Sequence, residues 1–288
     1  MGGPGRLEKH SNLGNFLTRP VRVVVLVIVL LSVLFPFYWL ITNAVKTSNE
    51  YFAKPPIMFP TRVTINNFVQ IVTQDEALKG LKNSFLIAFF TAVVTVISGS
   101  LAAYSLINGI LPRRFKTVLA MWFLVQKMYP AVVISVPVFF VMNSLHLLDS
   151  VWSLVIMNAS FNLPLVILLM IGFYAEAPFE IEEQAMIDGC DLFQRYLRIT
   201  TPMVKAGIVA VSILTFIGAW NEFLYAVILT ILRAKPLTVI IAGFITDKGI
   251  LWGPMAAMGC VVVLPVLVLM WIVQKDFVSG VSAGALKA

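Results

Sequence analysis

Six long apolar segments are spread along this chain of 288 residues and restrict what it can fold into. A helix needs about 20 mostly apolar residues to cross the hydrocarbon core of a bilayer, and each segment reaches or approaches that length. Because lipid offers backbone groups no hydrogen-bonding partner, a spanning segment of this kind must be helical. We therefore predict an all-α integral membrane protein with six transmembrane helices. The segments lie near 21–41, 84–107, 117–142, 152–174, 206–231 and 256–274.

The composition excludes an ordinary soluble domain. Hydrophobic residues make up 59% of the chain and charged residues 12%, and the mean hydropathy is +0.92. A soluble core can bury one helix as apolar as these segments, but six in a chain of this composition indicate a membrane domain. The fourth segment also carries Asn158, Asn162 and Pro164, which favour packing against protein over contact with lipid on all sides.

The distribution of Lys and Arg predicts the orientation, because these residues are retained in the cytoplasm. With the amino terminus inside, the inner segments hold twelve of the 21 Lys and Arg and the outer segments eight, while Lys127 lies within a span. The short inner loop after the second span contains Arg113, Arg114 and Lys116, whereas the outer segment 143–151 contains none. An even number of spans then leaves both termini in the cytoplasm. The net charge of +7 reflects this topology, and we expect no nucleic-acid partner.

These boundaries predict one membrane domain with two notable loops. Residues 1–20 form a cytoplasmic amino-terminal segment, 21–274 the six-span membrane domain, and 275–288 a cytoplasmic tail. The outer loop 42–83 contains several prolines, which suit an extended cap more than a folded domain. The inner loop 175–205 carries the densest run of charge in the chain.

The inner loop has the signals of two short helices joined at a glycine. Pro178 can begin the first helix, Glu182 and Glu183 lie near its positive amino end, and Gly189 can supply the left-handed residue that ends it.

Beyond the glycine, Leu192, Tyr196 and Ile199 recur at helical spacing, which predicts an amphipathic helix along the membrane surface that Pro202 ends. Such a pair fits either an anchor for the loop or a helix that docks into a groove of a soluble partner.

The same run, EEQAMIDGCDLFQRYLRITTP from Glu182 to Pro202, resembles the coupling loop of binding-protein-dependent ABC importers. That pattern contains an E-A-A element, then D-G-A, and later an aromatic, an apolar residue and a proline. Gln184, Cys190 and Ala206 depart from it. The matching positions are Glu183, Ala185, Asp188, Gly189, Tyr196, Ile199 and Pro202.

Two further stretches carry the resemblance across most of the chain. FIGAWNEFLYAVILT is similar to the W-N-[DE]-F segment of sugar permeases, and the terminal FVSGVSAGALKA is similar to their F-x-x-G-x-x-x-G-A-x-K tail. The likeness is strongest to the maltose-type carbohydrate permease subunit, which implies a type I ABC importer permease architecture with a cytoplasmic coupling-helix loop.

The resemblance implies a function and a set of partners. The chain would be the permease subunit of an ATP-driven carbohydrate importer, forming half of the translocation path by alternating access. Its partners would be a second homologous permease, two ATPase subunits and an extracytoplasmic sugar-binding protein, in a bacterial or archaeal cytoplasmic membrane. This chain would hold no cofactor, because ATP and Mg²⁺ would be bound by the ATPase subunits.

The resemblance also implies roles for residues of the inner loop. Glu183 would make a charged contact with an ATPase groove, Asp188 and Gly189 would shape the turn, and Ala185 would allow close approach. The tail from 279 to 288 either reaches the ATPase interface or is a frayed end. The ATPase-coupling residues are then Glu182, Glu183, Ala185, Asp188, Gly189, Tyr196 and Pro202.

Two charged residues lie within predicted spans. At about 1.5 Å per residue, Lys127 is roughly 15 Å and Glu222 roughly 24 Å from the inner side. Charges at such depths face protein or a water-filled path, so the two either pair structurally or line a cavity. Asn221 next to Glu222 is a further cavity candidate, and Trp220 and Tyr225 either stack on sugar faces or pack.

No catalytic or metal site is predicted. The sequence has no G-x-x-x-x-G-K-[ST] phosphate loop, and His10 and His146 fall on opposite sides of the membrane. Cys190 and Cys260 are too far apart in the topology to pair. A transport protein that works alone remains an alternative: an ion-coupled secondary transporter or channel in which Lys127 and the Glu222 carboxylate are coupling residues.

Overall fold

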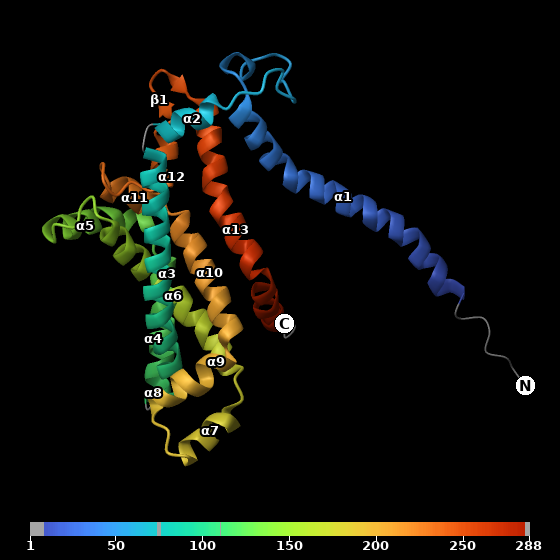
Figure 1. Ribbon diagram of the computed structural model, residues 1–288. Helices are drawn as coiled ribbons and strands as arrows, with labels where there is room; N and C mark the ends of the chain where they lie inside the picture. Colours follow the sequence, from blue (N-terminus) through green and yellow to red (C-terminus); the bar gives the residue numbers. More distant parts are fainter. Residues whose placement is uncertain (1–8, 74–75, 110, 286–288) are drawn as a thin grey trace, which may run out of the picture. The chain divides into compact units, whose positions relative to one another are not determined.

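The computed structural model describes residues 9–73, 76–109 and 111–285, and these are helical apart from connecting loops and one small hairpin (Figure 1). The elements are α1 (Lys9–Val45), η1 (Ser48–Glu50), α2 (Asn66–Thr73), α3 (Glu76–Asn108), α4 (Arg113–Met128), α5 (Ala131–Ser144), α6 (Val151–Ala175), α7 (Phe179–Ile187), α8 (Leu192–Gln194), η2 (Arg195–Thr200), α9 (Thr201–Met203), α10 (Lys205–Trp220), α11 (Leu224–Leu229), α12 (Leu237–Ala242), β1 (Ile245–Thr246), β2 (Gly249–Ile250) and α13 (Trp252–Ala285).

The chain divides into two compact units. One comprises Met1–Ile71 and Ile250–Cys260, and the other comprises Val72–Gly249 and Val261–Ala288. The second unit contains the inner loop and all the residues predicted to line a substrate path.

In the first unit, the predicted extended cap is partly ordered by η1 and α2. Asn67 of α2 donates its side-chain amide to the carbonyl oxygens of Ala44 (2.9 Å) and Lys46 (3.1 Å) at the end of α1. The Glu50 carboxylate accepts hydrogen bonds from the hydroxyl and backbone N–H of Thr61. These bonds lower the pKa of Glu50 to about 2. The outer loop is therefore built from fixed polar contacts, with residues 51–65 outside helices and strands.

The described helices account for four to six spans. Four are long and apolar enough to cross a membrane: 20–45 in α1, α3, α6, and 252–274 in α13. Two bent pairs bring the number to six if each is one span, namely α4 with α5, bent by 94°, and the α8–α9 segment with α10, bent by 84°.

The predicted third span, 117–142, is not one continuous helix. Tyr129 is extended, with φ −69° and ψ 130°, and α5 begins only after Pro130. Proline lacks a backbone N–H and disfavours helical geometry in the residue before it, so this pair breaks the run.

The predicted fifth span, 206–231, is also interrupted. Helix α10 ends at Trp220, residues 221–223 are irregular, and α11 is short. The Glu222 carboxylate accepts the backbone N–H groups of Tyr225 (2.7 Å) and Ala226 (3.0 Å). A side chain that satisfies the first free N–H groups of a helix favours a new start at that point, which explains the break.

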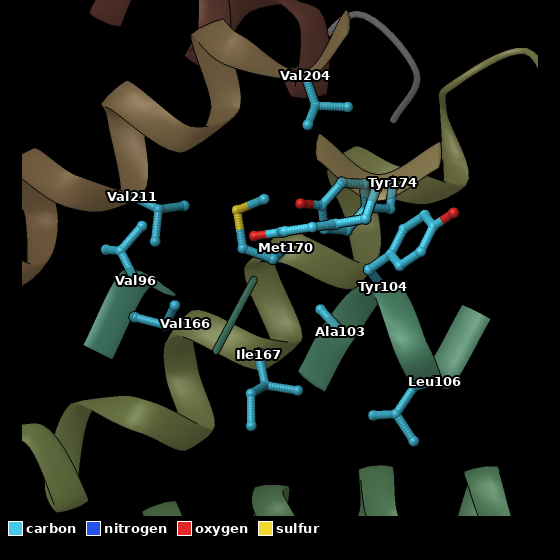
Figure 2. Packing of buried hydrophobic residues seen from close by; sticks show 11 residues of the cluster. Val96, Ala103, Tyr104, Leu106, Val166, Ile167, Met170, Tyr174, Val204 and Val211 are labelled. Atoms are coloured by element: carbon cyan, nitrogen blue, oxygen red, sulfur yellow. The ribbon is translucent and has the colours of Figure 1, made fainter. Parts of the chain in front are cut away.

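Helices α3, α6 and α10 pack closely in the second unit. Their apolar side chains meet in one buried cluster (Figure 2). The close approach requires glycine: a Cβ atom on Gly99 would lie 2.6 Å from Cγ1 of Val166, and one on Gly207 would lie 2.4 Å from the Phe173 ring. Small residues that bring helix backbones together are typical of membrane-spanning bundles.

A carboxylate ties two loops of this unit together. Asp149, before α6, accepts backbone N–H groups from each of residues 231–234, at 2.9–3.2 Å. Burial alone would raise the pKa of Asp149, but these donors, with Arg233 foremost, lower it overall. Asn83 donates to the carbonyl oxygens of Arg233 (2.9 Å) and Lys235 (3.0 Å) in the same segment.

The two predicted terminal segments are partly helical. Helix α1 begins at Lys9, and α13 continues to Ala285, so helix extends into both the predicted segment 1–20 and the predicted tail 275–288. Residues 1–8 and 286–288 lie outside the described residues.

Candidate functional site

The inner loop folds as a helix, a glycine turn and a second helical segment. Pro178 precedes α7, and the helix ends at Asp188. Gly189 has φ +82°, a left-handed conformation that costs glycine little, and its N–H donates to the carbonyl of Met186 (3.1 Å). Helix α7 lies at one end of the second unit, beyond the ends of α3, α6 and α10 (Figure 1).

The second helical segment differs from the predicted one. Asp191 and Gln194 form a capping box: the Gln194 N–H donates to the Asp191 carboxylate at 2.7 Å, and the Asp191 N–H donates to the Gln194 side chain at 3.1 Å. The turns that follow are a π-helix, η2. Pro202 was predicted to end the helix but lies in the first turn of α9, where its missing N–H is tolerated, and the bend comes at Val204.

Glu182 is directed into the bundle. Its side chain is buried, and Asn108 of α3 donates to both carboxylate oxygens, at 3.0 and 2.8 Å. Tyr104 of α3 donates a third hydrogen bond, and Arg195 of η2 forms an ion pair at 3.4 Å. Thr200 adds a hydroxyl at 3.4 Å. One carboxylate therefore connects α7 with α3 and η2.

Three tyrosines continue this network into the core. Ser100 lies 2.6 Å from the Tyr174 hydroxyl and 3.0 Å from the Tyr196 hydroxyl. The Tyr104 ring contacts both other rings, with centroids 5.6 Å from Tyr174 and 5.2 Å from Tyr196. All three tyrosines are buried. We call this set the inner cluster: Ser100, Tyr104, Asn108, Tyr174, Glu182, Arg195, Tyr196 and Thr200.

The other face of α7 is exposed. Glu183 and Asp188 point outward, in contrast to Glu182 and to Ala185, which is only 6% exposed and packs within the chain. Exposed apolar side chains lie among them: Ile181, Met186 and Ile187, the last 85% exposed. The face thus combines a carboxylate with apolar side chains, which suits docking against another protein.

The predicted substrate-path residues between 220 and 225 lie close together in sequence but play different roles. Trp220 and Tyr225 are buried, and each donates to a backbone carbonyl: the Trp220 indole to Val262 at 3.3 Å and the Tyr225 hydroxyl to Ala131 at 3.2 Å. Both therefore pack, and neither presents a ring to the surface. Asn221 is exposed.

Lys127 and Glu222 have separate partners. Lys127 is exposed, and its Nζ donates to the carbonyl oxygen of Phe161 at 3.0 Å. Glu222 is half-buried, and its carboxylate caps the start of α11 by accepting the Tyr225 and Ala226 N–H groups. Among residues 20–73, 76–109 and 111–274, whose side chains the structure describes, the one ion pair is Arg195–Glu182.

A small pocket beside Lys127 was not predicted. It has a volume of about 200 Å³ and is lined by Gln126, Tyr129, Ile134, Ser160, Phe161 and Pro164, among others. The signal that points to it in the sequence is the pair of prolines at 130 and 164, because a proline inside an apolar segment breaks the helix or leaves a carbonyl oxygen without its helical donor.

The comparisons with known proteins agree with this architecture. A family model described as the inner membrane component of binding-protein-dependent transport systems matches residues 95–275, which is more than half of the chain. The chain belongs to this family and is therefore a multi-pass membrane component of an ABC importer.

Two relatives match along nearly their whole length. The sulfoquinovosyl glycerol transport system permease protein SmoH of Agrobacterium fabrum is 31% identical over 273 residues, covering 94% of this chain and 95% of SmoH. The diacetylchitobiose uptake system permease protein DasC of Streptomyces coelicolor is 28% identical over 264 residues, covering 91% and 94%.

A solved structure shares the fold. A chain in the crystal structure of a bacterial ABC transporter that imports the acidic polysaccharide alginate aligns with a TM-score of 0.75 and 20% identity. The alignment covers 96% of this chain and 100% of that one.

Proposed function

We propose that this chain is one of two homologous permease subunits of an ATP-driven carbohydrate importer. It forms half of the translocation path by alternating access and transmits the movement of separate ATPase subunits to that path. The family match supports the importer, and the names of SmoH and DasC, which specify sulfoquinovosyl glycerol and diacetylchitobiose, support a carbohydrate substrate.

The observation that carries the coupling role is the two-sided character of α7. One face is fixed to α3 through Glu182, while Glu183, Asp188 and Ile187 are exposed on the other. A helix that is fixed to a span and exposed toward a partner can move that span when the partner moves. ATPase closure would therefore reach α3 through the inner cluster.

The partners follow from this role. Two ATPase subunits would bind ATP and Mg²⁺ and contact the exposed face of α7, since the chain has no phosphate-binding loop of its own. An extracytoplasmic sugar-binding protein would deliver the substrate. The distribution of Lys and Arg supports a cytoplasmic location for both termini and for α7 in a bacterial or archaeal cytoplasmic membrane.

The experiment that tests this proposal is purification of the tagged chain from its native membrane in mild detergent, with the stoichiometry of all chains determined by native mass spectrometry. We expect one related permease and two ATPase copies for each copy of this chain. Recovery of this chain alone, or as a homo-oligomer, would contradict the proposal.

A charge reversal on α7 tests the coupling role. Glu183→Lys is expected to lower ATP-dependent sugar uptake by at least about tenfold, because truncating or reversing one charge of an interfacial pair costs about 2 kcal/mol or more. The matched control is Glu180→Lys, which reverses an exposed charge on the same helix at a position that does not match the importer pattern. Equal uptake by the two variants would exclude Glu183 as the contact.

A further inference from the structure

The two helix breaks and the middle of α6 meet at one level of the second unit. At about 1.5 Å per residue, Ser160 lies roughly 22 Å from the inner end of α6, and Asn221 lies roughly 24 Å beyond the start of α10. Tyr129, which follows the 16-residue helix α4, lies at a similar distance from the start of α4. All three positions are exposed at this depth.

Direct contacts join these three regions. The Tyr225 hydroxyl, just beyond the second break, donates to Ala131, just beyond the first. The Tyr225 ring contacts Phe161 of α6, with centroids 5.2 Å apart. Lys127, just before the first break, donates to the Phe161 carbonyl. The breaks are therefore part of one fixed arrangement around Phe161.

Polar side chains that remain exposed within a membrane domain require an explanation. Gln126, Tyr129 and Ser160 lie around the 200 Å³ pocket and have accessible surface there or beside it. Hydrocarbon offers such groups no hydrogen-bonding partner, so they face a water-filled path or another polar surface.

The backbone around the pocket adds further acceptors. Pro164 has no N–H to donate to the carbonyl of Ser160, four residues earlier in α6, and the end of α4 before Pro130 leaves its last carbonyl groups without helical donors. The Ser160 hydroxyl donates to Ile156 at 2.8 Å and keeps its own oxygen as an acceptor.

Two aromatic rings complete the lining. Tyr129 is 57% exposed at the break, and Phe161 is half-buried at the pocket wall. Aromatic faces beside a few placed polar groups suit a ligand that is apolar on its ring face and polar at its edge. A pyranose ring has this character, with C–H groups on its face and hydroxyls around it.

We propose that this pocket is a subsite for one pyranose ring of the transported carbohydrate. The inference rests on the proposed function and adds that this permease subunit itself contacts the substrate. The ring stacks on Tyr129 and Phe161, while Gln126, Ser160 and the free carbonyl oxygens bind its hydroxyls. The volume suits one ring of an oligosaccharide, because pockets that enclose whole ligands are about 300–1,000 Å³. Lys127 acts indirectly by holding the Phe161 carbonyl.

The test uses the complete importer in proteoliposomes, supplied with its binding protein and with radiolabelled diacetylchitobiose, trehalose and maltose as probes. For a sugar that the wild type imports, Tyr129→Ala is expected to lower maximal uptake about tenfold, which corresponds to 1.4 kcal/mol. ATP hydrolysis stimulated by the loaded binding protein should stay within about twofold, since α7 is unchanged.

Two control variants separate stacking from general damage. Tyr129→Phe keeps the ring and is expected to retain uptake within about threefold of wild type. Phe140→Ala removes a ring of α5 that is 64% exposed and does not line the pocket, and it should leave uptake unchanged. If Tyr129→Ala behaves like Phe140→Ala, the subsite is excluded while the importer function stands.

A labelling experiment tests whether the pocket is open. In a background with Cys190 and Cys260 replaced by serine, Ser160→Cys should react with a charged, water-soluble methanethiosulfonate, and an imported sugar should slow the reaction. An unreactive Ser160→Cys, or a reaction rate that sugar does not change, would overturn the proposal. Absence of ATP-dependent uptake of every probe by the wild type would count against the carbohydrate importer itself and, with it, the subsite.

Discussion

The inner cluster and the pocket at the helix breaks are built in opposite ways. The inner cluster lies among α3, α6, α7 and η2, its tyrosines are buried, and its one carboxylate, Glu182, has four different side-chain partners. The pocket lies at the break between α4 and α5, against the middle of α6, and Gln126, Tyr129 and Ser160 are exposed there.

The contrast matches what each region has to do in an importer. A region that transmits movement must resist deformation, and buried polar groups that are hydrogen-bonded to one another between close-packed helices give it that stiffness. A region that passes a polar solute must keep unpaired donors and acceptors in contact with water. Three matched pairs of substitutions and one single substitution test how rigidly different parts of the protein are held. They are given from the largest expected effect to the smallest.

The largest effect is expected from removing the carboxylate at the centre of the inner cluster. Glu182→Ala leaves Arg195 buried without its ion-pair partner, which costs about 3–5 kcal/mol. Glu183→Ala removes the same group from the exposed face of the same helix and should change stability by less than about 0.5 kcal/mol. Thermal unfolding of the purified permease chain, without the ATPase subunits that Glu183 would contact, measures both. Similar midpoints for the two variants would contradict the buried network.

The next effect is expected from replacing a glycine of α3 or α6 by alanine. Whether the added methyl group destabilises or stabilises the protein depends on how closely the two helices pack at that position. Gly99→Ala brings a Cβ to 2.6 Å from Val166 and should destabilise the protein by about 1–3 kcal/mol. Gly172→Ala, on α6, meets nothing within 4 Å and should stabilise the helix by up to about 1 kcal/mol. Chemical denaturation in detergent measures the free energy of unfolding of each variant and shows whether it falls or rises. Equal effects would show that α3 and α6 are not in tight contact at Gly99.

A matched pair of tyrosine substitutions compares the two regions directly. Tyr104→Phe removes a donor to Glu182 within the inner cluster and should cost about 1–3 kcal/mol. Tyr129→Phe removes an exposed hydroxyl at the pocket, and the change should stay below about 0.5 kcal/mol. The comparison of thermal midpoints is the measurement. A larger loss of stability from Tyr129→Phe than from Tyr104→Phe would contradict the description of the inner cluster as the stiff region and the pocket as the open one.

The smallest effect concerns the carboxylate that holds residues 231–234. Because the folded-state pKa of Asp149 is lowered, its contribution to stability is present above the unfolded pKa of about 4 and is lost as the pH falls through the lower, folded value. Asp149→Asn should therefore destabilise the wild-type fold near neutral pH, by less than about 1 kcal/mol given its exposure. Unfolding measured from pH 7 to pH 3 should show the two proteins converging. A constant difference would contradict this account.

The sequence predicted the helical membrane architecture and the inner loop because both depend on local signals. Long apolar segments require helices in lipid, and Pro178 and Gly189 mark the bounds of α7 through their own backbone preferences. The predicted third and fifth spans are each interrupted, for a reason that is also local. Tyr129–Pro130 and the capping carboxylate of Glu222 outweigh the apolar character of the surrounding residues.

The direction of the side chains depended on contacts that sequence spacing does not reveal. Glu182 and Glu183 are neighbours at the start of one helix, and either could face the bundle. Glu182 does so because Tyr104 and Asn108, more than 70 residues earlier, lie beside it. Lys127 and Glu222 likewise find backbone partners that the depth of each residue in its span did not predict.

The most direct test of the importer is uptake by the reconstituted complex under two driving forces. We predict that sugar enters only when ATP and the binding protein are supplied, that a protonophore has no effect, and that Glu222→Gln retains uptake. Uptake by this chain alone, driven by an ion gradient and abolished by Glu222→Gln, would contradict the account and identify an ion-coupled transporter.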